Sequence, residues 1–292
     1  MSDQPQRPRD AEITRRGFFS ARLRRLCVSR SGTPSGFRRP PTARCLQFLL
    51  LASIAVAIVS PQSLSRTAAK RKILYITHSA GFKHAVLPLS EQILKEIGER
   101  SGMFEVTATQ DLSLITTEGL KPFAAVVFYT TGELLITDEQ KVALLDFIKS
   151  GKAFLGIHSA TDTFYKWAEY GEMIGGYFDQ HPWHQEVTVK VEDQKHPATK
   201  HLDESFKITD EIYQFKNWDR SKVHVLLSLD ATSVDLTKPA VHRTDKDFAL
   251  AWCRDYGRGR VFYTALGHRP EVWQDERFQQ LLIGAMRWAT RV

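Results

Sequence analysis

Cysteine is scarce in this 292-residue chain, which contains only Cys27, Cys45 and Cys253. The first two lie in an N-terminal leader, so the body of the protein holds a single thiol. One thiol cannot form an intramolecular disulfide, and stability must therefore come from core packing. Cys253 lies in an alternating apolar segment and is predicted to be a buried structural thiol. The fixed spacings of strong metal motifs, HExxH and paired CxxC, are also missing from the sequence.

The body of the chain also lacks a surplus of basic residues. The formal net charge of the whole chain is +7. Residues 1–44 contain eleven arginines and three acids, which gives this segment a charge of +8 and leaves −1 for the rest. A nucleic-acid-binding domain would need its Lys and Arg on the folded surface itself. We therefore expect no nucleic-acid partner.

Residues 1–70 are predicted to form an export leader. No residue from position 45 to position 65 is charged, and residues 48–59 are almost wholly apolar. An apolar run of this length suits the central region of a secretory signal better than a membrane span of about 20 residues. Together with the arginine-rich segment before it, the run indicates a targeting signal.

The leader also contains the sequence TRRGFF at residues 14–19. A twin-arginine pair of this kind is typical of proteins that are exported after folding. Small residues after the apolar run favour cleavage near Ser65 or after Ala69. An uncleaved membrane anchor and a mis-assigned start codon are alternatives. We expect an exported protein, periplasmic or extracellular, that contacts the membrane only through an uncleaved leader.

Residues 71–292 are predicted to form one domain, because no repeat, low-complexity tract or linker interrupts them. Apolar runs rich in β-formers alternate with amphipathic helical segments, which is typical of a mainly parallel sheet with helices on both faces. The strands expected in this α/β frame are residues 72–77, 104–108, 123–130, 152–157 and 259–264. Shorter alternating segments indicate an antiparallel extension at residues 185–191, 205–209, 222–229 and 248–254.

All ten histidines lie in the body of the chain. In open α/β sheets, ligands bind where the strands give way to loops at their carboxyl ends. His158 and His268 follow predicted strands, and His84 lies in the loop after the first one, where His78 also lies. His181 belongs to a segment that could fold over the same rim. We therefore expect three or four imidazoles to converge there.

Two carboxylates could join these imidazoles. Asp162 comes four residues after His158, although it could instead cap the following helix. Glu211 is equally compatible with a solvated turn. His184 could be a site residue or an ordinary strand residue. Histidines in polar or alternating segments are expected to be surface or hydrogen-bonding residues: His196, His201, His224 and His242.

A cluster of histidines and carboxylates has two chemical uses. Imidazole can transfer protons near neutral pH while a carboxylate fixes its tautomer. Neutral imidazoles and a carboxylate can also hold a divalent metal. The sequence leaves the cofactor unknown, with a divalent metal possible. Aromatic residues that could stack on a sugar, although most aromatics only pack, are Trp167, Tyr177, Trp183, Tyr213 and Trp218.

Five ordered segments of the body resemble the ThuA family, the trehalose-utilisation-like domain. They are GFKH at 81–84, GIHSATD at 156–162, GGYFDQHP at 175–182, DEIY at 210–213 and GRGRVFYTALGH at 257–268. The resemblance covers about residues 72–290. It implies a flavodoxin-like fold of the class I glutamine amidotransferase type. It also implies a link to the catabolism of disaccharides or their oxidised keto derivatives.

The chain departs from true amidotransferases at the strand exit that carries their catalytic cysteine. By resemblance, His158 occupies this position. An imidazole cannot replace a thiolate in forming a glutamyl thioester. We therefore expect no glutaminase activity.

The sequence thus predicts an exported enzyme that processes a small-molecule carbohydrate by acid/base chemistry. In this hypothesis His158 is the central proton-transfer group or a ligand, Glu211 is its carboxylate counterpart, and His268 completes the catalytic set by polarising substrate oxygens. Replacing His158 with Ala is expected to abolish turnover of a 3-keto-disaccharide while leaving the melting temperature nearly unchanged. The candidate substrate-binding residues are His84, Asp162, His181 and Tyr213.

Three other functions remain open from the sequence. The same rim could belong to a non-catalytic carbohydrate-binding domain or to a metal-dependent glycoside hydrolase. A regulatory subunit with an amidotransferase-like fold would require a protein partner, and the sequence identifies none.

Overall fold

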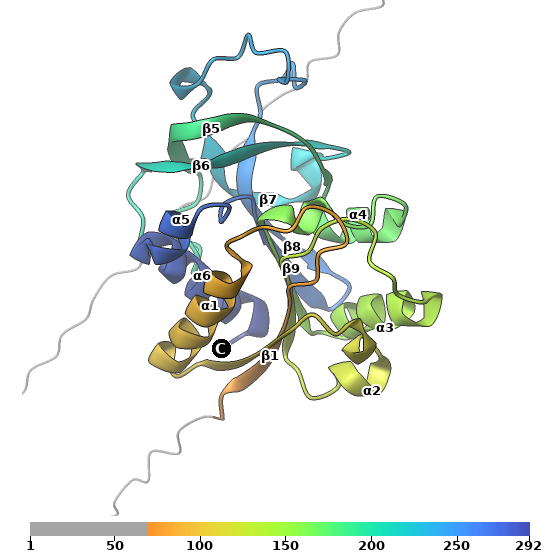
Figure 1. The fold of residues 1–292 in the computed structure, drawn as a ribbon. Helices are drawn as coiled ribbons and strands as arrows, with labels where there is room; N and C mark the ends of the chain where they lie inside the picture. Colours follow the sequence, from red (N-terminus) through yellow and green to blue (C-terminus); the bar gives the residue numbers. More distant parts are fainter. Residues whose placement is uncertain (1–68) are drawn as a thin grey trace, which may run out of the picture. The chain divides into compact units, whose positions relative to one another are not determined.

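The computed structural model describes residues 69–292 (Figure 1). The predicted leader, residues 1–70, lies almost entirely outside the described residues, as do Cys27 and Cys45. Within the described part, no helix combines the length and the apolar character needed to cross a membrane.

In this described part of the chain, nine strands form a single sheet with the order β2-β1-β3-β4-β9-β8-β7-β5-β6. The strands that pair in parallel are β1 (Arg71–Ile76), β2 (Phe104–Thr109), β3 (Ala125–Phe128), β4 (Ala153–Ile157) and β9 (Gly259–Thr264). The antiparallel extension continues from β9 through β8 (Ala249–Tyr256), β7 (His224–Leu229), β5 (Tyr177–Val191) and β6 (Ser205–Lys216). The predicted α/β fold, flavodoxin-like with an antiparallel extension, is confirmed.

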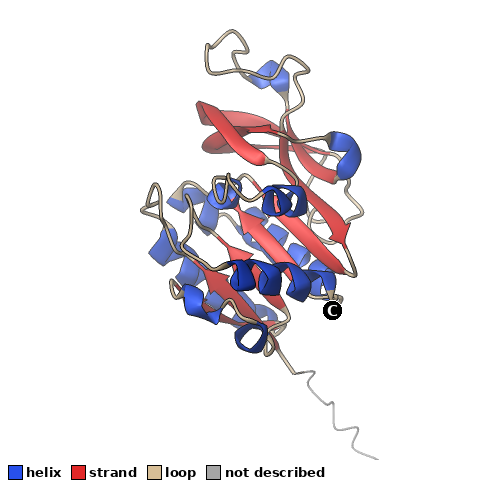
Figure 2. Cartoon of the chain, turned by 90° about the vertical axis from the view of Figure 1, so that its right-hand side faces the viewer, coloured by secondary structure: helices blue, strands red, loops and turns tan. Residues whose placement is uncertain are grey.

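Helices cover both faces of the parallel part of the sheet (Figure 2). One layer contains α1 (Leu87–Ser101), α5 (Pro270–Gln274) and α6 (Glu276–Thr290), which contact one another. The other layer contains α2 (Thr117–Leu120), α3 (Asp138–Lys149) and α4 (Ala168–Ile174) (Figure 1). Strands β1, β3, β4 and β9 are largely buried on both faces, which explains why they form continuous apolar runs in the sequence, whereas the edge strand β2 is partly exposed.

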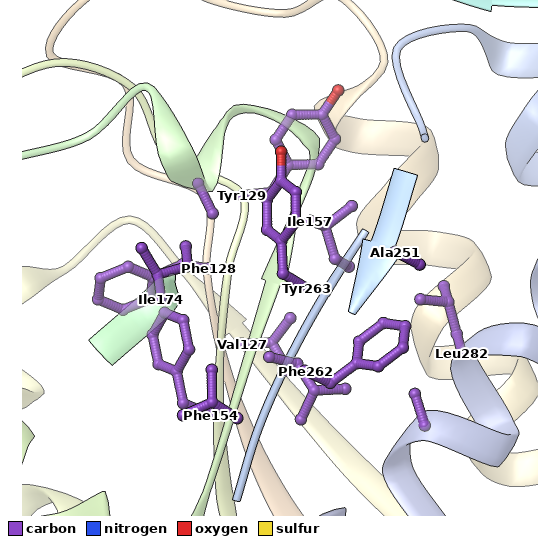
Figure 3. Close-up of a cluster of buried hydrophobic side chains, with 14 of the residues drawn as sticks. Val127, Phe128, Tyr129, Phe154, Ile157, Ile174, Ala251, Phe262, Tyr263 and Leu282 are labelled. Atoms are coloured by element: carbon purple, nitrogen blue, oxygen red, sulfur yellow. The ribbon is translucent and has the colours of Figure 1, made fainter. Parts of the chain in front are cut away.

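The core between these layers is built from large side chains (Figure 3). Phe128 of β3 and Phe154 of β4 pack edge to face on one side of the sheet, with their ring centroids 5.2 Å apart. Phe262 of β9 and Leu282 of α6 are buried in the same cluster. Burying each such side chain stabilises the fold by about 1.5–3 kcal/mol. Within residues 69–292, apolar packing thus holds the sheet in place, and the one cysteine there, Cys253, is free.

Two strands are longer than the sequence pattern predicts. Strand β5 begins at Tyr177 rather than at residue 185, and β6 continues to Lys216 rather than ending at residue 209. Register shifts between Phe178 and Trp183 break the alternation of buried and exposed residues in β5. In β6, residues 210–215 are all buried, and this run includes two acids. The pattern of apolar residues alone therefore does not reveal the first half of β5, which is bulged, or the end of β6, which contains buried acids.

The tight packing between sheet and helix can be tested by a substitution at the start of β9. A Cβ on Gly259 would overlap the backbone carbonyl oxygens of Ile148 and Lys152. We expect Gly259→Ala to destabilise the fold by about 1–3 kcal/mol through overpacking, which thermal or urea unfolding would detect. Gly81→Ala is the control, because its Cβ would meet only ordinary van der Waals contacts. Equal melting temperatures for the two variants would contradict this description of the packing.

Candidate active site

The predicted convergence of imidazoles occurs at the carboxyl ends of the parallel strands. His158 follows β4 directly, His268 lies in the loop after β9, and His84 lies in the loop between β1 and α1. The ring centroids of these three side chains are 5.0 to 5.2 Å apart. The long hairpin of β5 and β6 supplies the residues that face them. The site therefore joins the parallel frame to the antiparallel extension.

His158 sits on a strained turn between β4 and a short 3-10 helix, His158–Thr161. Its φ of 46° lies in the left-handed region, which a non-glycine residue adopts only when the surrounding structure imposes it. The ring Nδ1 donates a hydrogen bond to the carbonyl oxygen of Ala265, at 2.6 Å. In the neutral imidazole this bond leaves the lone pair on Nε2. The Tyr213 hydroxyl lies 2.9 Å from the same Nε2.

Glu211 lies between two pairs of histidines. Its Oε2 is 3.1 Å from Nε2 of His158 and 3.0 Å from Nδ1 of His268. Its Oε1 is 2.9 Å from Nε2 of His184 and 3.6 Å from Nδ1 of His181. His184 is the direct cross-strand partner of Glu211 in the β5–β6 pairing, which explains the short contact. One buried carboxylate therefore contacts four imidazoles.

The loop that carries His268 is held by the side chain of Asp210. This buried carboxylate accepts hydrogen bonds from the backbone N–H groups of Gly267 (2.7 Å) and Arg269 (3.1 Å). Tyr129 and Trp273 both donate to the carbonyl oxygen of Gly267. Because these bonds fix the backbone on both sides of His268, its ring is presented to Glu211 in one position.

A cavity of about 410 Å³ opens over this cluster, a size within the usual range of about 300–1,000 Å³ for small-molecule sites. Its walls combine polar groups with the two phenyl rings of Phe82 and Phe178. Phe82 is 66% exposed although it is a large apolar side chain. The residues lining the cavity are Phe82, His84, Asp162, Phe178, His181, His184, Glu211, Tyr213 and His268.

The electrostatics of the cluster follow from its burial and its contacts. Burial alone would raise the pKa of Glu211, but its hydrogen bonds with His158 and His268 lower the pKa below the usual range. The hydrogen bond to Glu211 raises the pKa of His268, against the opposing effect of partial burial. Burial and the neighbouring His158 and His268 lower the pKa of His84 to about 3. At neutral pH, Glu211 is therefore ionised and His84 is neutral.

His158 is more deeply buried than a group that exchanges protons with a substrate should be. Its side chain has 0% exposure, and it does not line the cavity. Direct proton transfer between His158 and a substrate is therefore not supported, whereas its other predicted role, as a ligand, is compatible with this position. Replacing a buried, hydrogen-bonded ring leaves a cavity and an unpaired carbonyl group, so the expectation of an unchanged melting temperature for His158→Ala is corrected.

The other predicted residues lie at or near the cavity. Asp162 does not cap the following helix, because the N-cap of α4 is Trp167; instead its side chain accepts a hydrogen bond from the Tyr165 hydroxyl at 2.5 Å. Burial raises the pKa of Asp162. Glu211 is a buried strand residue and not a solvated turn acid. The geometry brings these residues together without testing their roles.

Two residues that line the cavity, and one that supports the site from behind it, were not singled out from the sequence. Phe82 and Phe178 lie within the motifs of the family resemblance, and Asp210 immediately precedes Glu211, but no periodicity distinguishes them. Of the five aromatics considered for stacking on a sugar, only Tyr213 lines the cavity. The remaining four are buried in the packing of the domain: Trp167, Tyr177, Trp183 and Trp218.

The remaining histidines lie elsewhere. His78 follows β1, but its Nδ1 contacts the carbonyl oxygen of Gln110 and it does not line the cavity. The four expected to be surface or hydrogen-bonding residues are also outside the site: His196, His201, His224 and His242. Cys253 is buried in β8, as predicted, and burial raises its pKa to about 12.

The fold is that of a flavodoxin-like, amidotransferase-like protein, and its candidate site is built from imidazoles and carboxylates. The sequence profile of the ThuA family, described as trehalose utilisation, matches residues 72–289. The chain therefore belongs to the ThuA family, and this membership indicates carbohydrate utilisation in general.

Solved structures agree with this assignment. A ThuA-like protein from Bacteroides uniformis ATCC 8492 is 25% identical, with a TM-score of 0.65 over 79% of this chain and 95% of the other. A ThuA-like protein from Parabacteroides merdae ATCC 43184 is 22% identical, with a TM-score of 0.61 over 76% of this chain and 90% of the other; it supports the fold alone. No curated protein matches the chain.

The anchoring role of Asp210 can be tested by Asp210→Asn. The amide has nearly the same shape, but it offers one acceptor oxygen and places an NH₂ group against a backbone N–H. We expect a loss of about 1–3 kcal/mol in the free energy of unfolding. Asp203→Asn is the matched control, because Asp203 is exposed. If both variants unfold at the wild-type denaturant concentration, Asp210 does not hold the loop.

Proposed function

We propose that this protein is an enzyme that cleaves the glycosidic bond of a keto-sugar glycoside by acid/base chemistry at the Glu211 cluster. The observation that carries the proposal is the pairing of one ionised, buried carboxylate with imidazoles that reach an open cavity. His184 and His268 have side-chain exposures of 42% and 27%, so both can meet a substrate. The membership in a family of carbohydrate utilisation supports a sugar as that substrate.

His184 is the proposed base. Its Nε2–H donates to Oε1 of Glu211, and this bond leaves the lone pair on Nδ1. A carboxylate that fixes the tautomer of an imidazole also stabilises the cation formed when the imidazole takes a proton. His181 lies 3.1 Å from His184 and is the proposed partner that returns a proton to the leaving oxygen.

The proposed reaction uses the ketone of the substrate. A ketone at C3 of the glycosyl ring acidifies the C2–H bond. His184 removes this proton, the C2–H electrons form a C1–C2 double bond, and the C1–O bond breaks with its electrons on the leaving oxygen, which takes up a proton. Water then adds across the double bond, so the overall change is hydrolysis. His268 and His84 are proposed to polarise the ketone oxygen, while Phe82 and Phe178 contact the apolar face of the sugar ring.

The test is turnover of a 3-keto-disaccharide by purified protein. We expect His184→Ala to lower kcat by about 100-fold or more, the usual contribution of a general base. The control is His242→Ala, because His242 is 51% exposed and lies outside the cavity. Turnover in deuterium oxide should place deuterium at C2 of the product, and the parent disaccharide without a ketone should not react.

Two results would contradict this proposal. Tight binding of the sugar without product after long incubation would indicate a carbohydrate-binding module instead. Undiminished turnover by His184→Ala would remove His184 from the reaction.

We further propose that residues 1–70 direct the protein out of the cytoplasm. Expressed at full length in a bacterium with both export systems, the protein should accumulate outside the cytoplasm with an N-terminus near Lys70. The double variant Arg15→Lys, Arg16→Lys should remain inside if the twin-arginine pair is used. The matched control, Arg24→Lys with Arg25→Lys, changes a second arginine pair of the leader and should be exported. Wild-type protein of full-length mass in the cytoplasm would contradict the proposal.

A further inference from the structure

Three donor atoms meet at the floor of the cavity in an almost equilateral triangle. They are Nε2 of His158, Nδ1 of His268 and Oε2 of Glu211, and they are separated by 3.0 to 3.2 Å. Ligand atoms about 2.1 Å from a metal lie about 3.0 Å apart at right angles and about 3.4 Å apart at the tetrahedral angle. The observed separations therefore match three adjacent positions around one metal ion.

Protein hydrogen bonds satisfy this triangle only in part. Because Nδ1 of His158 donates to the Ala265 carbonyl, Nε2 of the neutral ring is an acceptor, and the Tyr213 hydroxyl lies 2.9 Å from it. Oε2 of ionised Glu211 is also only an acceptor, and Nδ1–H of His268 can donate to it. Even with these two donors in place, Nε2 and Oε2 face each other as acceptors at 3.1 Å. A cation at the centre would replace this repulsion with three bonds.

The surroundings of His158 are those of a metal ligand. Histidines that bind metals usually donate their second ring N–H to a carbonyl or carboxylate, which fixes the ring and its tautomer. The bond to Ala265 does this for His158. Ala265 belongs to the same loop as His268, and Asp210 anchors that loop, so two of the three donors are fixed by one backbone segment.

His84 provides an independent observation. Only 4% of the surface of His84 is exposed, yet its Nδ1 has no hydrogen-bond partner among residues 69–292. One of its ring nitrogens lies within 4.8 Å of the three donor atoms. A buried ring nitrogen without a hydrogen-bond partner is unfavourable. A metal ion at the triangle would offer the His84 ring a partner.

We infer that the chain binds one divalent transition-metal ion through His158, His268 and Glu211, with His84 as the fourth ligand. Imidazole and carboxylate donors suit Zn²⁺, Mn²⁺ and Fe²⁺, and this set contains no thiolate that would restrict the choice. Binding would displace the proton that His268 shares with Glu211. His268 and Glu211 line the cavity, so a free coordination position can face the substrate.

The consequence for catalysis rests on the proposed function. An ion at this position would polarise the ketone oxygen of a bound keto-sugar and strengthen the acidity of its C–H bond. The pair His181 and His184 would remain on Oε1 of Glu211, where they transfer protons. The separation of the two oxygens of Glu211 thus divides the site into a metal side and a proton-transfer side.

The experiment measures metal content without any sugar. Untagged protein is stripped with a chelator, incubated with Zn²⁺, Mn²⁺ or Co²⁺, separated from free metal and analysed by mass spectrometry of the elements. We expect about one equivalent per chain for wild type. His268→Ala and Glu211→Gln should weaken binding of the preferred ion by about 100-fold or more, whereas His184→Ala should retain it.

Circular dichroism and melting temperature establish that each variant is folded, and the wild-type result does not depend on any variant. No bound metal above background for all three ions would overturn the inference. Loss of the ion in His184→Ala with retention in His268→Ala would also overturn it, because the ion would then lie on the more exposed side of Glu211. Turnover of a keto-sugar by metal-free protein would leave the proposed function intact and reject only a metal requirement.

Discussion

The buried carboxylate of Glu211 is the interaction on which the site depends. A charge removed from water is stable only when it is paired and hydrogen-bonded, and the histidines around Glu211 meet this requirement. Oε2 faces His158 and His268, and Oε1 faces His184 and His181. Each imidazole is oriented by the same group, so removing that group would loosen all of them together. The carboxylate therefore organises the cluster as well as carrying its charge.

The fold makes this arrangement possible by bringing two different parts of the sheet together. Parallel strands β1, β4 and β9 end at one edge, where their loops present imidazoles. The β5–β6 hairpin, at the far end of the sheet order, supplies Glu211 and its cross-strand partner. Apolar packing stabilises the parallel frame, whereas polar contacts of Asp210 and Glu211 join the hairpin to it. The apolar core thus stabilises the frame, and the polar contacts both position the site and add to its stability.

The parallel frame and the convergence of His84, His158 and His268 could be predicted from the sequence, because apolar strands and the loops after them follow simple physical patterns. The full length of the hairpin strands and the burial of their acids could not be predicted. Bulges hide the first half of β5, and the charges of Asp210 and Glu211 interrupt the apolar pattern of β6, so both segments lack the expected alternation. The depth of His158 could not be predicted either, since burial of a polar residue depends on partners, such as Ala265, that are distant in the chain.

The contacts between the Glu211 carboxylate and the surrounding imidazoles can be probed directly by ¹⁵N NMR of the histidine rings at neutral pH. The account predicts that in Glu211→Gln the ring nitrogen signals of His158, His184 and His268 all shift relative to the wild type. The signals of His201 and His224, which lie away from the cluster, should be unchanged. Ring signals of the three site histidines that are identical in both proteins would contradict the central role of this carboxylate.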